Sequence, residues 1–305
     1  MKNIWSKIAL SLGFIAGSAT FNMAYAESLV GINSANQIGV FDSSNVAAAA
    51  FVDILGLNKG ESLIGIDLRP SNNTLYGISS ANNLYTLDAY SGAATLVAML
   101  NTPIINTTLG YGIDFNPVAD RTANASLRVV SSAGSNYAVN VNAGANAGVV
   151  ATQTSIVGGN SAVAYANSDP TQVAAPASTA LYYVNSANDT LSVATSAFNN
   201  PMITKVGDLT LNGNPLDILN ANGFELFSNG SAFLAATIND SDLMTKLYGI
   251  NLGTGAAIDL GTFNGTLNGL AAAPSAVPLP AALPLMASAL GLFGLSRRNK
   301  VKKAA

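Results

Sequence analysis

The sequence predicts an all-β protein, folded as a β-propeller of five blades. In the chain of 305 residues, short apolar runs alternate with Asn, Ser, Gly and Asp, which is typical of strands joined by tight turns. No long segment has the spacing of apolar residues that a helix requires. A short phrase also recurs at intervals of roughly 50 residues, and such a period, built from several short strands, is typical of a propeller.

The recurring phrase is an apolar strand followed by a turn in which Ser, Ala, Asn and Gly predominate. Asn and Gly tolerate positive φ, and Asn and Ser side chains can hydrogen-bond the turn backbone. Successive copies begin 46, 52, 54 and 52 residues apart, and the fifth is the least regular. The strands of the five copies are residues 29–32, 75–78, 127–130, 181–184 and 233–236.

A second element precedes some copies and predicts how the ring closes. Residues 65–70 and 112–117 are near duplicates that begin Gly-Ile-Asp and end in Pro. A related segment at residues 269–274 has no blade after it, whereas the copy that starts at Leu29 has no such strand before it. We therefore expect the C-terminal strand Leu267–Ala272 to complete the first blade, which removes an open sheet edge.

Two other architectures stay open at this point. Six blades would result if residues 140–180 contained an additional sheet. A jelly roll or sandwich fits the number of strands but not the period.

The first 26 residues predict a secretory signal peptide outside this domain. Lys2 and Lys7 form a basic start, an uncharged and mostly apolar run follows, and Ala24 and Ala26 form a small-x-small cleavage site. The apolar run is shorter than a bilayer-spanning helix, which argues against the alternative of a transmembrane anchor. We expect signal peptidase to cut here, so that the propeller domain comprises residues 27–274.

The last segment, residues 275–305, predicts a second targeting signal. An uncharged segment follows a short proline-containing motif and is a marginal membrane span, and the positive-inside rule places the basic tail in the cytoplasm. The motif is Val277, Pro278, Leu279, Pro280 and Ala281, and the basic tail begins with Arg297 and Arg298.

This tripartite tail resembles the PEP-CTERM class of bacterial sorting signals in its VPLPA variant. The resemblance implies processing by an exosortase after transient membrane anchoring through the C-terminal helix. It also implies a Gram-negative bacterium that makes extracellular polysaccharide, with the protein delivered to the cell surface or the extracellular matrix. The alternative is a plain C-terminal anchor.

Composition excludes several classes of function. Cysteine and histidine are both absent, so the chain has no disulfide framework, thiol nucleophile, Ser-His-Asp triad or imidazole metal site. Between the two terminal signals lie six basic and 16 acidic residues, a net charge of −10. Such an acidic body lacks the basic surface of a nucleic-acid binder.

The repeats themselves resemble a bacterial family of exported proteins that is known only as a domain of unknown function. The shared phrases are Gly-Ile-Asp-Phe-x-Pro, Leu-Tyr and Gly-Ala-Ala-Thr, and the resemblance covers residues 28–274. It implies a propeller-like fold but no activity, so it assigns no catalytic residue.

Aspartates in the innermost strands are the candidate metal ligands. Asp67 and Asp114 occupy equivalent places in two blades, and Asp217 is a candidate third. Carboxylates that face the central channel would suit Ca²⁺, which prefers oxygen ligands. The alternative is that each Asp accepts hydrogen bonds from nearby backbone N–H groups.

Three functions remain open on the sequence alone. The favoured one is a non-catalytic propeller that binds a polysaccharide or another exported protein. Tyrosines beside the strands could contact sugars, and the arginines Arg69, Arg121 and Arg128 could pair with sugar carboxylates. The alternatives, which the sequence favours, are packing of the tyrosines within the blades and pairing of each arginine with a nearby Asp. The second is a metal-dependent hydrolase or lyase acting on exported polysaccharide, although no nucleophile is paired with a base. The third is a purely structural matrix component.

Overall fold

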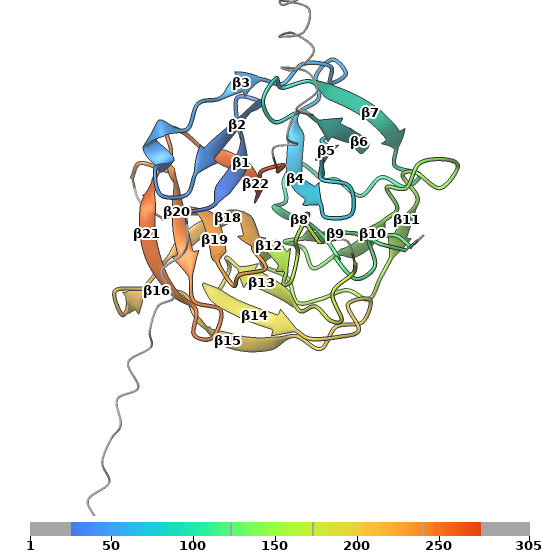
Figure 1. Cartoon of the computed structure of the whole chain (residues 1–305). Helices are drawn as coiled ribbons and strands as arrows, with labels where there is room; N and C mark the ends of the chain where they lie inside the picture. The colour runs from blue at the N-terminus through green and yellow to red at the C-terminus, as the bar shows by residue number, and fades with distance from the viewer. Residues whose placement is uncertain (1–25, 123, 173, 240, 276–305) are drawn as a thin grey trace, which may run out of the picture.

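A computed structural model describes residues 26–122, 124–172, 174–239 and 241–275. These residues form an all-β propeller of five blades around a central axis (Figure 1). The signal-peptide and sorting-signal predictions lie outside the described residues, apart from Ala26 and Ser275, which are both exposed. Within the described residues, no helix has the length and apolar character needed to cross a membrane.

Each of the first three blades is a four-stranded antiparallel sheet, written here from its innermost strand outward. Blade one contains β22 (Leu267–Ala272), β1 (Ser28–Asn33), β2 (Gln37–Asp42) and β3 (Val52–Asp53). Blade two contains β4 (Leu63–Arg69), β5 (Thr74–Ser79), β6 (Asn83–Leu87) and β7 (Ala94–Met99). Blade three contains β8 (Tyr111–Phe115), β9 (Leu127–Ser131), β10 (Asn136–Val139) and β11 (Val150–Thr152).

The last two blades follow the same plan, with one addition. Blade four contains β12 (Asn160–Tyr165), β13 (Leu181–Asn185), β14 (Thr190–Ala194) and β15 (Thr204–Asp208). Blade five contains β18 (Ile218–Leu226), β19 (Ala232–Ile238), β20 (Thr245–Ile250) and β21 (Ala256–Thr262). The hairpin of β16 (Thr210–Leu211) and β17 (Asn214–Pro215) extends blade five, since β16 pairs in parallel with β21. A short 3-10 helix, η1 (Val46–Ala48), lies between β2 and β3.

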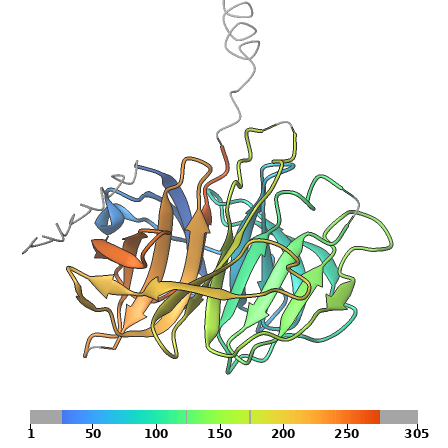
Figure 2. The same ribbon diagram turned by 90° about the horizontal axis from the view of Figure 1, so that it is seen from below.

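These sheets confirm the five-bladed prediction over its two alternatives. Residues 140–180 contain β11 and β12, which belong to blades three and four, rather than a sixth sheet. Each innermost strand packs against the innermost strands of the two adjacent blades, which a two-sheet sandwich does not allow. Seen edge-on, the ring has blades one and five on one side and blade three on the other (Figure 2).

The C-terminal strand closes the ring as the sequence predicts. Strand β22 pairs antiparallel with β1, with Leu29 opposite Ala272 and Gly31 opposite Leu270. The backbone N–H of Ala273 also donates to the carbonyl of Ser28 at 2.9 Å. Blade one is therefore built from both ends of the described chain, and β1 is not left with an unpaired edge.

The recurring turn works through its Asn and Ser side chains. Asn36 and Asn82 have φ values of 61° and 63°, the left-handed region that Asn tolerates. The Oδ1 atom of Asn82 accepts hydrogen bonds from the backbone N–H groups of Ile104 and Ile105 at 2.7 and 2.8 Å. The same residue thus shapes the hairpin of blade two and holds the segment that leads into blade three.

Candidate functional site

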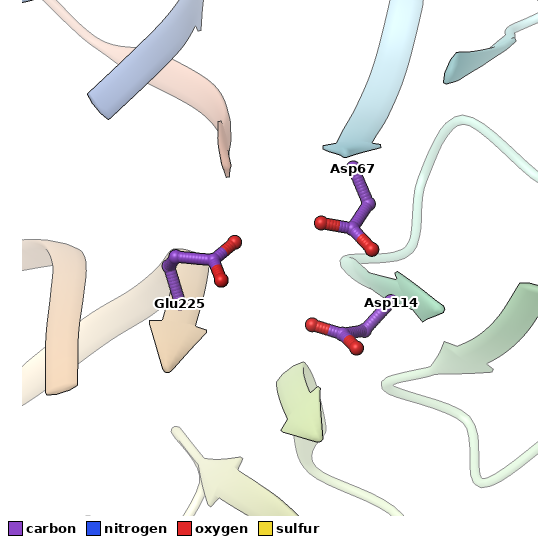
Figure 3. A group of neighbouring side chains, drawn as sticks. All are labelled: Asp67, Asp114 and Glu225. Carbon is purple, nitrogen blue, oxygen red and sulfur yellow. The ribbon is translucent and has the colours of Figure 1, made fainter. Parts of the chain in front are cut away.

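The innermost strands bring three carboxylates together on the channel axis. Asp67 on β4, Asp114 on β8 and Glu225 on β18 point toward one another (Figure 3), and each offers an oxygen within 4.8 Å of the others. The three side chains come from blades two, three and five, so the cluster exists only in the closed ring. All three residues are buried, with at most 4% of their surface exposed.

A glycine precedes each carboxylate by two positions, and strand geometry explains the pairing. Side chains two apart in a strand lie on one face, so Gly65, Gly112 and Gly223 form the adjacent layer of the channel. A Cβ atom on Gly112 would lie 2.6 Å from the backbone nitrogen of Val163, and one on Gly223 would lie 2.6 Å from Leu270. Glycine therefore allows the inner strands to approach closely, and the space left between them is about 10 Å³.

Backbone N–H groups donate hydrogen bonds to the carboxylates, and Asp114 accepts one from Tyr165. The Oδ2 atom of Asp67 accepts the N–H of Phe115 on the adjacent blade at 2.6 Å. Glu225 accepts the N–H of Ala272 through Oε2 at 3.0 Å and its neighbour's N–H through Oε1 at 3.2 Å. The Oδ1 atom of Asp114 is buried and accepts no hydrogen bond. A buried carboxylate oxygen without a hydrogen-bond donor would be stabilised by a proton or a cation beside it.

Burial raises the pKa of all three groups, and neighbouring negative charges raise it further. Burial raises the pKa of Asp67 to about 8. Burial, and then the charge of Asp67, raise the pKa of Asp114 and of Glu225 well above their usual ranges. No lysine or arginine of the described chain lies within ion-pair distance of the three carboxylates, since the buried Arg69 pairs with Asp120 instead. Without a cation, the cluster therefore holds protons at neutral pH.

The spacing and the chemistry of the cluster are compatible with a hard divalent cation. Ca²⁺ binds six to eight oxygens at about 2.3–2.6 Å, so ligands on opposite sides of one ion lie about 5 Å apart. The 4.8 Å limit on the spacing of these carboxylate oxygens is compatible with one central ion. Asp67, Asp114 and Glu225 supply oxygens only, and the unsatisfied Oδ1 of Asp114 would become a ligand.

The structure unites two of the three aspartates proposed from the sequence and places the third elsewhere. Asp217 is exposed in the connection between β17 and β18, where its Oδ2 atom accepts the side-chain N–H of Asn239 at 3.2 Å. Glu225, eight residues further on, takes the third position in the channel. The sequence contains a signal for it, because Gly223-Phe-Glu225 repeats the pattern of Gly65-Ile-Asp67 and Gly112-Ile-Asp114.

The channel opens into a pocket at each end. A pocket of about 270 Å³ near the glycine layer is lined by residues that include Thr107, Leu109 and Asn220. A pocket of about 250 Å³ at the other end is lined by Glu27, Asp169 and Ser275 among others, and it reaches Glu225. Asp67 and Asp114 thus lie between the two mouths without lining either, whereas Glu225 borders the second one.

Fold and site together define a five-bladed β-propeller with an acidic, enclosed channel. The chain belongs to the family described as a domain of unknown function (DUF4394), whose sequence pattern matches residues 37–271. No curated protein matches the chain.

Solved structures with a similar course of the chain have very different sequences. A chain of the nidogen/laminin complex is 10% identical, with a TM-score of 0.45, over 80% of this chain and 97% of that one. A protein of unknown function from Bacteroides thetaiotaomicron is 13% identical, with a TM-score of 0.46, over 68% of this chain and 52% of that one. A luciferin-regenerating enzyme is 11% identical, with a TM-score of 0.41, over 79% of this chain and 77% of that one.

Proposed function

We propose that this protein is a non-catalytic binding module of the cell surface or extracellular matrix, with a divalent cation in its channel. Its partner is an extracellular polysaccharide, and Ca²⁺ is the cation that the donor set favours. One observation supports the cation: three buried carboxylates share a space without a positive partner among the described residues, and one oxygen accepts no hydrogen bond.

The energetic argument for a cation is one of charge. An ionised carboxylate is costly to bury without a partner, and two or three in contact are more costly still. The protein can protonate them or place a cation among them. A cation bound by blades two, three and five would join parts of the ring that are far apart in the chain, with the carboxylates of Asp67, Asp114 and Glu225 as its ligands.

The enclosure of the site supports a structural cation over a catalytic one. A hydrolytic metal needs an open coordination position that a substrate can reach. Here the glycine layer leaves about 10 Å³ on one side of the carboxylates, which is about the space of one water molecule. On the other side Glu225 borders a pocket, but only 4% of its surface is exposed.

The location of the protein rests on the terminal segments of the sequence. The predicted signal peptide supports export, and the VPLPA-type tail supports sorting by an exosortase to the surface or matrix. The acidic body between them lacks the basic surface that nucleic-acid binding requires.

A comparison of two Asp→Asn variants tests the cation. The full chain, stripped with EDTA, is titrated with Ca²⁺ by calorimetry, and its thermal unfolding is followed with and without the ion. We expect one ion per chain and an increase in the unfolding temperature. Asp114→Asn should abolish both effects, whereas Asp217→Asn, which changes an exposed aspartate outside the cluster, should leave both intact. Absence of Ca²⁺ binding by the unmodified chain would refute the channel cation.

Co-sedimentation with extracellular polysaccharide of the producing strain tests the binding function. We expect saturable binding by the full chain, weakened by EDTA if the channel cation holds the ring in its binding conformation. Ca²⁺-dependent cleavage of the polysaccharide would instead establish the hydrolase or lyase alternative. Self-association without any polysaccharide binding would establish a structural component.

A further inference from the structure

One buried arginine of the described chain, Arg128, has no carboxylate partner. Arg128 on β9 is only 5% exposed. Its Nε, Nη1 and Nη2 atoms donate to the Tyr165 hydroxyl and to the side-chain oxygens of Asn136 and Asn199, at 3.3, 2.8 and 2.9 Å. These acceptors are all neutral.

Arg69, by contrast, is a buried arginine whose charge is neutralised by a carboxylate. It is similarly buried, at 8% exposed, but its Nε atom lies 2.6 Å from a carboxylate oxygen of Asp120. In the described chain no carboxylate lies within 4.0 Å of Arg128. Asp114 is opposite Arg128 on the β8–β9 ladder, but its carboxylate belongs to the channel cluster. A buried guanidinium without a counter-charge is costly, so an anion would stabilise it.

The arginine lies in a pocket with room for such an anion. A cavity of about 580 Å³ lies between blades three and four, adjacent in Figure 1. Arg128 lines it together with Asn124, Gln153, Asn199 and Phe198, whose ring also packs edge-on against Tyr165, and alanines supply much of the remaining wall. No Asp or Glu is among the lining residues, although the propeller as a whole is acidic.

The position of Asn199 indicates where a ligand oxygen would bind. Asn199 is exposed, and its Oδ1 atom accepts a hydrogen bond from the Nη2 atom of Arg128. The backbone is held independently, since the carbonyl of Asn199 accepts the N–H of Thr154 at 3.0 Å and that of Phe198 accepts the Asn136 amide at 3.2 Å. The side chain can therefore turn away and leave its place to a carboxylate oxygen without moving the loop.

We propose that this pocket binds the carboxylate of an acidic sugar unit, with Arg128 as the group that recognises the charge. A guanidinium presents paired N–H donors that match a carboxylate. The surrounding amides suit hydroxyl groups, and the Phe198 ring offers an apolar surface to the C–H face of a sugar ring. The inference rests on the proposed function, since it names uronic-acid residues as the part of the polysaccharide that is bound.

Binding of uronic-acid oligomers to the full chain tests the proposal. Oligogalacturonate and a neutral gluco-oligomer of equal length are titrated by calorimetry, with acetate as a third probe. We expect the acidic oligomer to bind at least tenfold more tightly than either of the other two. Equal binding of the neutral oligomer would refute recognition of charge, and equal binding of acetate would refute recognition of a sugar.

Two kinds of variant test whether the oligomer binds in this pocket. Arg128→Gln should weaken oligogalacturonate binding at least tenfold, and its thermal unfolding shows whether the fold is kept. Ala151→Trp places a bulky side chain in the pocket from an exposed position without altering the arginine, and it should weaken binding severalfold. Ala145→Trp, at an exposed alanine of the same blade that does not line the cavity, should bind as the unmodified chain does.

The outcomes also separate this proposal from the binding function. If the native polysaccharide sediments with the chain but Ala151→Trp binds as well as the unmodified chain, the function stands and this pocket is refuted as its site. If oligogalacturonate binds in the pocket while the native polysaccharide does not bind, the pocket stands and the function fails.

Discussion

Three carboxyl groups in one enclosed space make the metal-free protein sensitive to pH. Burial raises the pKa of Asp67 to about 8, and those of Asp114 and Glu225 also lie well above their usual ranges. In the unfolded chain the same groups lose their protons near pH 4. Between about pH 4 and 8 the native state therefore binds more protons than the unfolded state, and its stability falls as the pH rises.

We expect the free energy of unfolding in EDTA to decrease by about 1.4 kcal/mol per pH unit for each proton that the cluster retains. Denaturant unfolding at pH 5, 6, 7 and 8 measures this slope. Asp67→Asn should make it shallower, and Asp217→Asn should not change it. A stability that is flat or rises over this range would show that the cluster is ionised without metal. With Ca²⁺ present the trend should weaken, because the ion displaces protons and binds more tightly at higher pH.

The buried ion pair between Arg69 and Asp120 predicts a large effect of a single substitution. Asp120 is fully enclosed, and it also accepts hydrogen bonds from Ser71 and Ser126. Asp120→Ala leaves the arginine without a counter-charge and should lower the free energy of unfolding by about 3–5 kcal/mol. Asp208→Ala, in the exposed pair with Lys205, should cost less than about 1 kcal/mol. If urea unfolding gave comparable losses of unfolding free energy for the two variants, the prediction would be wrong.

Among the elements, the inner strands depend on glycine for their close packing. A Cβ atom at Gly112 would overlap the backbone of Ala162 and Val163 on β12, at 2.6–2.9 Å, and backbone cannot rotate out of the way. We expect Gly112→Ala to lower the free energy of unfolding by about 1–3 kcal/mol and to weaken Ca²⁺ binding, because the adjacent carboxylate would move. Gly253→Ala is the control, since its Cβ would meet only one side-chain oxygen at 3.4 Å. The prediction fails if both variants unfold at the same denaturant concentration.

At this scale the sequence predicted the ring but not all of its parts. The period of the repeats and the unpaired strand at residues 267–272 were sufficient for five blades and for their closure, because both follow from local patterns. The β16–β17 hairpin follows no repeat; its parallel pairing with β21 joins segments that are distant in the chain. The unpaired charge of Arg128 was equally inaccessible, since it depends on which side chains surround it after folding.

The sequence likewise predicted only part of the candidate metal site. Asp67 and Asp114 were found because their surroundings are near duplicates. Glu225 was missed because the fifth copy has Glu in place of Asp and lacks the proline that follows the other two. Asp217 was chosen as an acid inside a short apolar run, but that run precedes the buried part of β18. The spacing of a glycine and an acid by two residues was the more reliable signal.

For the whole molecule, a closed ring has no terminal blade that can separate first. Every innermost strand has two neighbours of the same kind, and blade one joins the two ends of the described chain. We therefore expect a single cooperative thermal transition, with the calorimetric enthalpy equal to the van't Hoff enthalpy. Loss of blade one in a separate, earlier transition would show that β22 closes the ring only weakly.

The two ends of the described chain lie at one mouth of the channel, and this has a mechanical consequence. Glu27 and Ser275 line the same pocket, and two hydrogen bonds of 3.0 Å tie Ser275 to Asn73 of blade two. A pull on the C-terminal side of Ser275 would reach β22, whose ladder with β1 would be loaded along its length. Several backbone hydrogen bonds would then resist together instead of opening one after another. The opposite mouth, near Thr107 and Asn220, would carry none of this load.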